Sequence, residues 1–296
     1  MLLATKTLAL IEAASRQPDF HREFKRAIAD YQVKEDSVRG HLGASLIGRS
    51  CPRALWYGFR WANGTNEREK VAGRMIRLWQ RGDIEEFRFI ALLRIAGIQV
   101  WNVDENGKQI GFESGYFAGS MDGIAGGVPD VPRGEFCNLE FKTHNSKSFA
   151  KLLKEGVRSS KFEHFVQMQI YMKKKALRWA LYLAVNKDTD EIHAEIVAFE
   201  QEVADKYDAR AIYIIEAKEA PPKIHNDASW FECKFCDFHA VCHRGQEIAR
   251  SCRTCVHGFA GNQEKMWGCN YHQEWRSKEE QLEGCSNYVP IKTLPV

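Results

Sequence analysis

The chain lacks a long hydrophobic run, since no stretch approaches the roughly 18 uninterrupted apolar residues that a membrane span requires. Residues 1–14 are apolar only in patches, because Lys6 and Glu12 interrupt them, and no small-residue cleavage site follows a basic start. We therefore expect neither a membrane-spanning segment nor a signal peptide. This favours a cytoplasmic protein.

A strong charge of one sign is also missing. The chain carries 42 Lys and Arg against 39 Asp and Glu, a formal net charge of +3, which does not by itself indicate a nucleic-acid-binding protein. The positive charge is instead local, in residues 147–161 and again in residues 173–178. Solvated helix faces explain either run alone equally well. Their position after a strand predicted at 136–143 favours contact with phosphate groups.

No flavin or dinucleotide motif is visible, so the sequence offers no electron donor for a redox centre. Nine cysteines are present, and without a secretory signal they argue against a disulfide framework and for metal ligation. Eight of them sort into two sets: Cys51, Cys233, Cys236 and Cys242, then Cys252, Cys255, Cys269 and Cys285. Cys137 is left over, and we predict a small buried hydrophobic residue there.

Apolar periodicity predicts an α/β fold with helices on both sides of a sheet. The predicted helices are 7–29, 71–96, 146–155, 162–175 and 202–218, and the predicted strands are 98–103, 109–113, 116–124, 136–143, 179–186 and 192–199. A turn at 104–107 would join the first two strands. From Cys233 onward the regular pattern fades while Cys, His, Trp and Gly accumulate, which is typical of metal-organised loops.

Two charged side chains share one face of the strand predicted at 136–143. Glu140 and Lys142 are two residues apart and point together, while the odd-numbered neighbours point to the other face. An isolated Glu-x-Lys tripeptide is most often a surface salt bridge. Gly119-x-x-Asp122 on the preceding strand reverses those odds, because Asp122 supplies a second carboxylate, and carboxylates with waters and phosphate oxygens are what Mg²⁺ prefers.

Gln167 and Tyr171 lie four residues apart on the predicted helix 162–175 and therefore share one face. Alone, they would be ordinary boundary residues. They gain meaning from the order of the motifs along the chain: Cys51, Gly119-Ser120-Met121-Asp122, Glu140-Phe141-Lys142, Gln167-x3-Tyr171 and Cys233-x2-Cys236-x5-Cys242.

This ordered set resembles the PD-(D/E)xK nuclease superfamily, in its RecB-like, CRISPR-associated and phage exonuclease branch. The resemblance covers residues 45–242. It implies a restriction-endonuclease-like core, with a mixed central sheet flanked by helices, that hydrolyses DNA with Mg²⁺ or Mn²⁺. It also implies that Asp122, Glu140 and the carbonyl of Phe141 hold the metal, while Lys142 orients the attacking water.

The same resemblance assigns Gln167 to the network of metal, water and phosphate, and Tyr171 to a contact with DNA. Relatives also carry an acid or histidine four residues after a glycine in an earlier helix. Here Gly82 places Glu86 in that position, with Glu85 as the competing choice. The histidine common in the family is absent, which leaves open how a second metal would be held.

For the first cysteine set, the resemblance implies a [4Fe-4S] cluster that fastens the carboxy-terminal loop to Cys51, with a structural role. Four thiolates suit zinc equally well, so zinc stays the alternative. The second set has a zinc-ribbon layout, with His272 as an alternative to Cys285 and His257 as a weaker candidate. Three aromatic side chains nearby are expected to form a small core or to stack on bases: Trp267, Tyr271 and Trp275.

The sequence thus predicts a DNA exonuclease, encoded by a phage or prophage, that acts on single strands or duplex ends in recombination, replication or repair in the host cytoplasm. We expect a helical arm at 1–40, a nuclease core with an iron-sulfur staple at 41–245, and a zinc-binding appendage at 246–296. The alternatives are a non-catalytic nucleic-acid-binding protein with structural metal centres, and a redox protein. The sequence leaves open the polarity of cleavage, whether the enzyme is an exonuclease or an endonuclease, and whether it prefers DNA or RNA. It also leaves open any recombination partners and homo-oligomerisation.

Overall fold

The computed structural model describes residues 1–28, 39–64, 73–261 and 266–292. The chain forms two compact units, each assembled from separated segments. The first comprises Met1–Glu35, Ala72–Phe112 and Gly119–Asp205, and the second comprises Asp36–Val71, Glu113–Ala118 and Lys206–Val296. The sequence predicted a division into three contiguous segments, 1–40, 41–245 and 246–296. Part of the first segment (29–38) lies outside the described residues, and this division stays a prediction.

A six-stranded mixed sheet forms the centre of the first unit, in the order β1-β9-β8-β7-β6-β3. Its strands are β1 (Leu2–Leu3), β3 (Gln99–Trp101), β6 (Gly123–Gly126), β7 (Phe136–His144), β8 (Trp179–Asn186) and β9 (Ile192–Ala198). Strands β7 and β8 run parallel, and the other neighbouring pairs run antiparallel. The continuous apolar run of β8 suits its central place, because both of its faces are buried.

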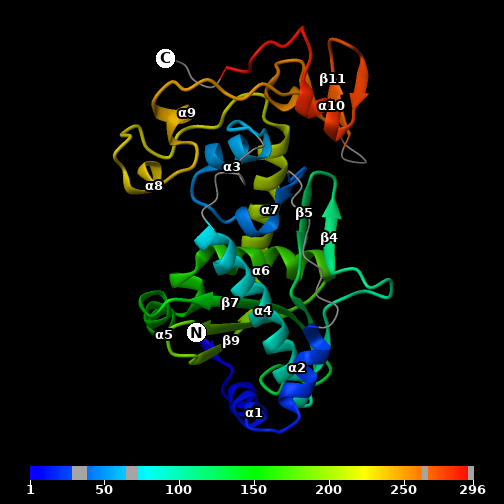
Figure 1. The fold of residues 1–296 in the computed structure, drawn as a ribbon, viewed down its shortest axis with the longest axis vertical. Helices are drawn as coiled ribbons and strands as arrows, with labels where there is room; N and C mark the ends of the chain where they lie inside the picture. The colour runs from blue at the N-terminus through cyan, green and yellow to red at the C-terminus, as the bar shows by residue number, and fades with distance from the viewer. Residues whose placement is uncertain (29–38, 65–72, 262–265, 293–296) are drawn as a thin grey trace. The chain divides into compact units, whose positions relative to one another are not determined.

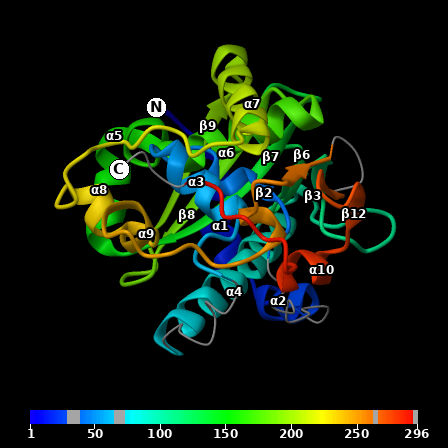
Figure 2. The same ribbon diagram turned by 90° about the horizontal axis from the view of Figure 1, so that it is seen from above.

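Helices cover both faces of this sheet (Figures 1 and 2). On one face α1 (Thr5–Ser15) and α4 (Gly73–Ile95) pack on the odd-numbered side chains of β7 and β8, and α2 (Phe20–Ile28) packs on α4. On the other face α5 (Ser146–Ser160) and α6 (Phe162–Lys175) pack on the even-numbered ones. Because strand side chains alternate, the even-numbered residues of β7 point toward α5 and α6.

The predicted α/β architecture, a mixed central sheet flanked by helices, is therefore confirmed. Cys137 is 0% exposed within the core, as predicted. In the part of the chain that the structure describes, no helix is long and apolar enough to cross a membrane.

The single strand predicted at 116–124 is wrong. It forms two strands in different sheets, β5 (Phe117–Ser120) and β6. The predicted strand is interrupted just before Gly123. This residue has φ +156°, and it lies so close to β3 that a Cβ would be 2.9 Å from the carbonyl oxygen of Trp101. Only glycine fits there, and the residue before it, Asp122, lies outside both strands.

One further prediction needs correction, and another is confirmed. The helix predicted at 7–29 is interrupted after Ser15, where Pro18 precedes α2; Ala29 lies outside the described residues. The turn predicted at 104–107 is present, with Gly107 N donating to Asp104 O at 3.0 Å. Beside the turn the two arms pair through an antiparallel bridge between Val103 and Gln109. Beyond this bridge they separate, since β3 joins the large sheet and β4 (Gly111–Ser114) pairs with β5 in a small sheet that also contains β2 (Leu42–Gly43).

The second unit is built from short elements. They are α3 (Pro52–Phe59), most of α7 (Gln201–Glu216), α8 (Phe231–Lys234), α9 (His239–His243), β10 (Gly258–Ala260), β11 (Trp267–Cys269), β12 (Glu274–Arg276) and α10 (Lys278–Glu283). Strands β10, β11 and β12 form an antiparallel sheet. Trp267 is 0% exposed and is a core residue, whereas Tyr271 and Trp275 are exposed by 55% and 53%.

A buried arginine joins distant segments within this second unit. The guanidinium of Arg253 lies 3.9 Å from the ring centroid of Trp61. It also donates to the carbonyls of Phe59 and Gly40 and to the side chain of Gln281. These three hydrogen bonds and the stacking on Trp61 offset part of the cost of burying the cation, and burial still lowers the pKa of Arg253 to about 10. The segment that begins at Cys252 therefore packs as part of this unit.

Candidate active site

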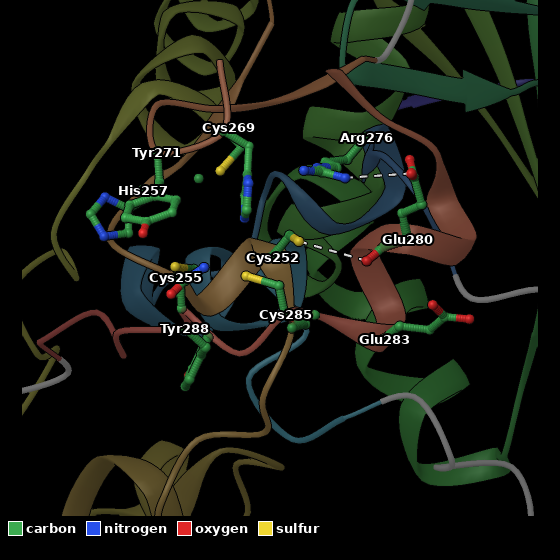
Figure 3. Close-up of a pocket in the computed structure, with 15 residues that line it drawn as sticks. Cys252, Cys255, His257, Cys269, Tyr271, Arg276, Glu280, Glu283, Cys285 and Tyr288 are labelled. Carbon is green, nitrogen blue, oxygen red and sulfur yellow. Dashed lines mark hydrogen bonds and ion pairs between the residues drawn. The ribbon is translucent and has the colours of Figure 1, made fainter. Parts of the chain in front are cut away.

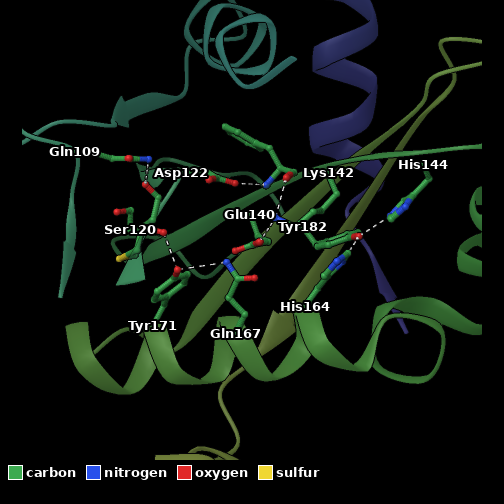
Figure 4. Close-up of polar contacts among 12 residues, drawn as sticks. Gln109, Ser120, Asp122, Glu140, Lys142, His144, His164, Gln167, Tyr171 and Tyr182 are labelled. Carbon is green, nitrogen blue, oxygen red and sulfur yellow. Dashed lines mark hydrogen bonds and ion pairs between the residues drawn. The ribbon is translucent and has the colours of Figure 1, made fainter. Parts of the chain in front are cut away.

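Glu140 and Lys142 project from the face of β7 that α6 covers (Figure 4). The Glu140 side chain is 0% exposed, and its Oε1 forms an ion pair with Nζ of Lys142. Nζ also donates to the carbonyl of Phe141 at 3.1 Å. The other carboxylate oxygen of Glu140, Oε2, is buried and has no hydrogen-bond partner among the described residues. An orphaned carboxylate oxygen in such a place is costly unless a further group binds it.

Burial raises the pKa of Glu140 to about 7, and the nearby charge of Asp122 adds to this, although Lys142 opposes it. Burial alone would lower the pKa of Lys142. The negative charges of Glu140 and Asp122 outweigh this effect and raise the pKa of Lys142 above its usual value. Lys142 therefore stays cationic at neutral pH. Two carboxylates and one cation thus lie close together beside the buried Glu140, where a bound divalent cation would favour its ionised form.

Asp122 is held against β7 from the break between β5 and β6. Its Oδ2 accepts a hydrogen bond from the backbone N–H of Phe141 at 2.6 Å. This bond fixes one oxygen of Asp122 between the positions of Glu140 and Lys142 along β7. The sequence placed Asp122 within a strand, whereas the structure places it directly before β6.

Helix α6 supports this segment through Gln167 and Tyr171. The hydroxyl of Tyr171 donates to the carbonyl of Ser120 at 2.6 Å, and the amide of Gln167 donates to the same hydroxyl at 3.3 Å. Both side chains are buried, and Gln167 rises from α6 toward Glu140 (Figure 4). Tyr171 thus positions the segment that leads to Asp122, and its predicted contact with DNA stays a prediction.

Two acids on α4 were considered for the site, Glu86 and Glu85, and the placement of Glu86 in the site stays a prediction. The charge of Glu86 contributes to the raised pKa of Lys142. Glu85 is buried and pairs with Arg88 on the same helix at 2.6 Å. Glu86 is therefore the acid of α4 within electrostatic reach of Lys142.

The sequence reading missed a second polar group on the same face of the sheet. The hydroxyl of Tyr182 lies 2.9 Å from Nε2 of His144 and 3.0 Å from Nδ1 of His164. Two signals pointed to it: His144 continues the alternation of Glu140 and Lys142, and His164 precedes Gln167 by three residues. Neither signal identifies Tyr182, because its contact depends on the parallel pairing of β7 with β8.

The first cysteine set lines one cavity in the second unit. Cys51 is the N-cap of α3, and the other three cysteines lie in or beside α8 and α9. Burial raises the pKa of Cys233 and of Cys236, and in each case the charges of Cys51 and Cys242 raise it further. The thiols are therefore close enough to repel one another as thiolates.

The second cysteine set lines a separate cavity of about 150 Å³ (Figure 3). Burial raises the pKa of Cys252 to about 11, and the charges of Cys285, Cys269 and Cys255 follow as causes. His272 also lines the cavity, and its Nε2 is buried without a hydrogen-bond partner among the described residues. Both Cys285 and His272 therefore remain available as the fourth ligand.

Within residues 1–28, 39–64, 73–261 and 266–292, no three or more His, Cys, Asp or Glu side chains are arranged so that they could hold a metal ion as they stand. The donor chemistry nevertheless fits. Each cavity gathers four thiols, and the acidic site has an unpartnered carboxylate oxygen on Glu140. Asn138, on the same face of β7, also keeps both side-chain amide atoms unpartnered.

The raised pKa of Glu140 predicts how stability depends on pH without added divalent cation. A glutamate in the unfolded chain ionises near 4.5, whereas Glu140 in the fold keeps its proton up to about 7. Its contribution to stability is therefore full below pH 4.5 and is lost as the pH rises through 7. We expect the unfolding temperature to fall between pH 5 and pH 8 by a few degrees more in the wild type than in Glu140→Gln. Equal falls in thermal scans of both proteins would contradict this.

Comparisons with known proteins give little. No family model and no curated protein matches the chain. A solved structure described as SSO0001 is similar with TM-score 0.40 and 18% identity, over 77% of this chain and 97% of that one. An alkaline exonuclease (LHK-Exo) from Laribacter hongkongensis is similar with TM-score 0.43 and 16% identity, over 60% and 87%, and LHK-Exo in complex with dAMP with TM-score 0.40 and 16% identity, over 66% and 90%.

Proposed function

We propose that this protein is a metal-dependent nuclease of the PD-(D/E)xK type that hydrolyses phosphodiester bonds in DNA. The observation that carries the proposal is the convergence of Asp122, Glu140 and Lys142 on one face of the sheet, with an oxygen of the buried Glu140 left unpartnered. A purely structural ion pair would have no reason to leave that oxygen without a hydrogen bond.

Asp122, Glu140 and the carbonyl of Phe141 would hold Mg²⁺ or Mn²⁺, with Glu86 as a further acid. Such an ion supplies a nucleophilic water at neutral pH and neutralises charge on the phosphate in the transition state. Lys142 holds a positive charge beside that phosphate and donates hydrogen bonds to the attacking water. The water oxygen would bond to phosphorus and the bond from phosphorus to the leaving sugar oxygen would break, while the proton given up by the water would pass through solvent to that leaving oxygen.

Gln167 and Tyr171 support this chemistry from α6. Tyr171 fixes the backbone at Ser120, and with it the approach of Asp122, while Gln167 orients the Tyr171 hydroxyl. Such supporting contacts matter because catalysis depends on groups held in place before the substrate arrives.

The two cysteine sets are proposed as structural metal centres. Cys51, Cys233, Cys236 and Cys242 would hold a [4Fe-4S] cluster, and Cys252, Cys255 and Cys269, with Cys285 or His272, would hold Zn²⁺. The gathering of each set around its own cavity supports this. In each case the metal would stabilise an otherwise loop-rich segment.

The biological role proposed is exonucleolytic processing of single strands or duplex ends during phage recombination, replication or repair. Digestion of end-labelled linear DNA and circular DNA, single- and double-stranded, tests it. We expect linear DNA to be degraded with Mn²⁺ or Mg²⁺ while circular DNA stays intact. Cleavage of circles would instead indicate an endonuclease, and binding of DNA without cleavage under all conditions would favour a non-catalytic nucleic-acid-binding protein.

A further inference from the structure

Three buried or half-buried polar side chains form a connected group beside the Glu140–Lys142 pair (Figure 4). Tyr182 is 0% exposed, and its hydroxyl lies within hydrogen-bond distance of the rings of His144 and His164. On its far side, Nδ1 of His144 lies 3.4 Å from the hydroxyl of Ser148, which also accepts a hydrogen bond from Nζ of Lys161. The contacts run without a break from Lys161 to His164.

The chemistry of the donors gives this chain a direction. The ammonium of Lys161 can only donate, so it orients the Ser148 hydroxyl to give its own proton to Nδ1 of His144. A neutral imidazole has one N–H, so His144 then donates from Nε2 to the Tyr182 hydroxyl. Tyr182 in turn donates to Nδ1 of His164. With this tautomer the proton of His164 lies on Nε2.

Both rings stay neutral in the range where a nuclease would work. Burial, together with the positive charges of Lys142 and Lys161, lowers the pKa of His144 to about 4 and that of His164 to about 2. Neither ring can therefore serve as an acid at neutral pH. Each can serve as a neutral hydrogen-bond donor of fixed orientation, which the ordered contacts above provide.

The place of His164 connects this group with the acidic site. His164 and Gln167 are three residues apart on α6 and share the face that covers β7. His144 follows Lys142 by two residues on the matching face of the strand. His164 keeps part of its surface exposed, whereas His144 and Tyr182 are buried. Of the three, His164 is the member with exposed surface that a ligand can reach, and it lies close enough to Lys142 to feel its charge.

We propose that His164 donates a hydrogen bond from Nε2 to a phosphate oxygen of the strand bound at the Glu140–Lys142 site, and that Tyr182 and His144 are positioning residues that hold His164 in the required tautomer. This inference rests on the proposed nuclease function. A neutral donor suits a phosphate beside a metal-binding site, because it binds the anion without adding a positive charge that would repel the cation.

Two substitutions of His164 separate the proposed role from a structural one. The amide of asparagine reaches about as far as Nδ1 and can still accept from Tyr182, but it leaves the Nε2 position empty. The amide of glutamine reaches the Nε2 position and restores a donor there. We expect His164→Asn to raise KM for linear DNA, and Kd for DNA with Ca²⁺ in place of Mg²⁺, by about tenfold, with kcat changed much less. His164→Gln should recover most of that loss.

Tyr182→Phe should raise KM and Kd in the same direction by a smaller factor, because His164 remains but its tautomer is no longer fixed. The exposed residues His21 and Tyr213 give matched controls, since His21→Asn and Tyr213→Phe should change neither constant. A lower unfolding temperature for His164→Asn with unchanged KM and Kd would show a structural role only. KM and Kd values closer to wild type in His164→Asn than in His164→Gln would show the same. Wild-type protein that neither cleaves nor binds DNA would overturn the proposed function and this inference together, whereas cleavage unaffected by either substitution would overturn this inference alone.

Discussion

Replacement of Glu140 by glutamine is expected to lower the rate of DNA cleavage by roughly two to three orders of magnitude, the usual cost of losing a preorganised electrostatic contact in an active site. Glutamine keeps the size of the side chain but removes the negative charge that Glu140, together with Asp122, would offer to a divalent cation. The rate is best measured as single-turnover cleavage of end-labelled linear DNA with saturating Mn²⁺.

Glu163 gives the matched control, because it is an exposed carboxylate on α6. Glu163→Gln should cleave at the wild-type rate. Combining Glu140→Gln with Asp122→Asn or Lys142→Ala should add little further loss, since these side chains act as one unit. A Glu140→Gln protein that keeps more than about a tenth of the wild-type rate would show that this carboxylate does not hold the catalytic cation.

Protein purified without oxygen is expected to be brown and to contain about four iron atoms per chain. Substitution Cys51→Ala should remove the colour and the iron, although Cys51 is far in sequence from the three cysteines that share its cavity. Iron analysis and the visible absorption spectrum measure both effects. Because the cluster would join α3 to the α8–α9 segment, protease should then cut near α8 and α9 more readily.

Cys137 gives the control for this experiment, since it is buried in the sheet core and belongs to neither set. Cys137→Ala should keep its iron, and Cys252→Ala should lose zinc but keep iron. A colourless wild-type protein that carries zinc in both cavities and no iron would show that the first set is a zinc site.

The sequence predicted best what depends on local periodicity. The alternation along 136–143 placed Glu140 and Lys142 on one face of β7, and the helical spacing of Gln167 and Tyr171 placed them together on α6. Both patterns are properties of single elements, so they survive whatever the rest of the chain does.

What the sequence did not predict depends on contacts between distant segments. The break at Gly123 arises from the close approach of β6 to Trp101, and the group around Tyr182 needs the register of β7 with β8. Strands β10, β11 and β12 are three residues each, too short to show a period of two. Such features follow from packing, which periodicity does not encode.

The most direct test of the account is the release of nucleotides from end-labelled linear DNA by the wild-type protein, with Mn²⁺ and with EDTA. If Asp122, Glu140 and Lys142 form a metal-dependent active site, nucleotides are released with Mn²⁺ and none with EDTA. DNA that is bound but never cut with either Mn²⁺ or Mg²⁺, or that is cut equally well in EDTA, would contradict the account.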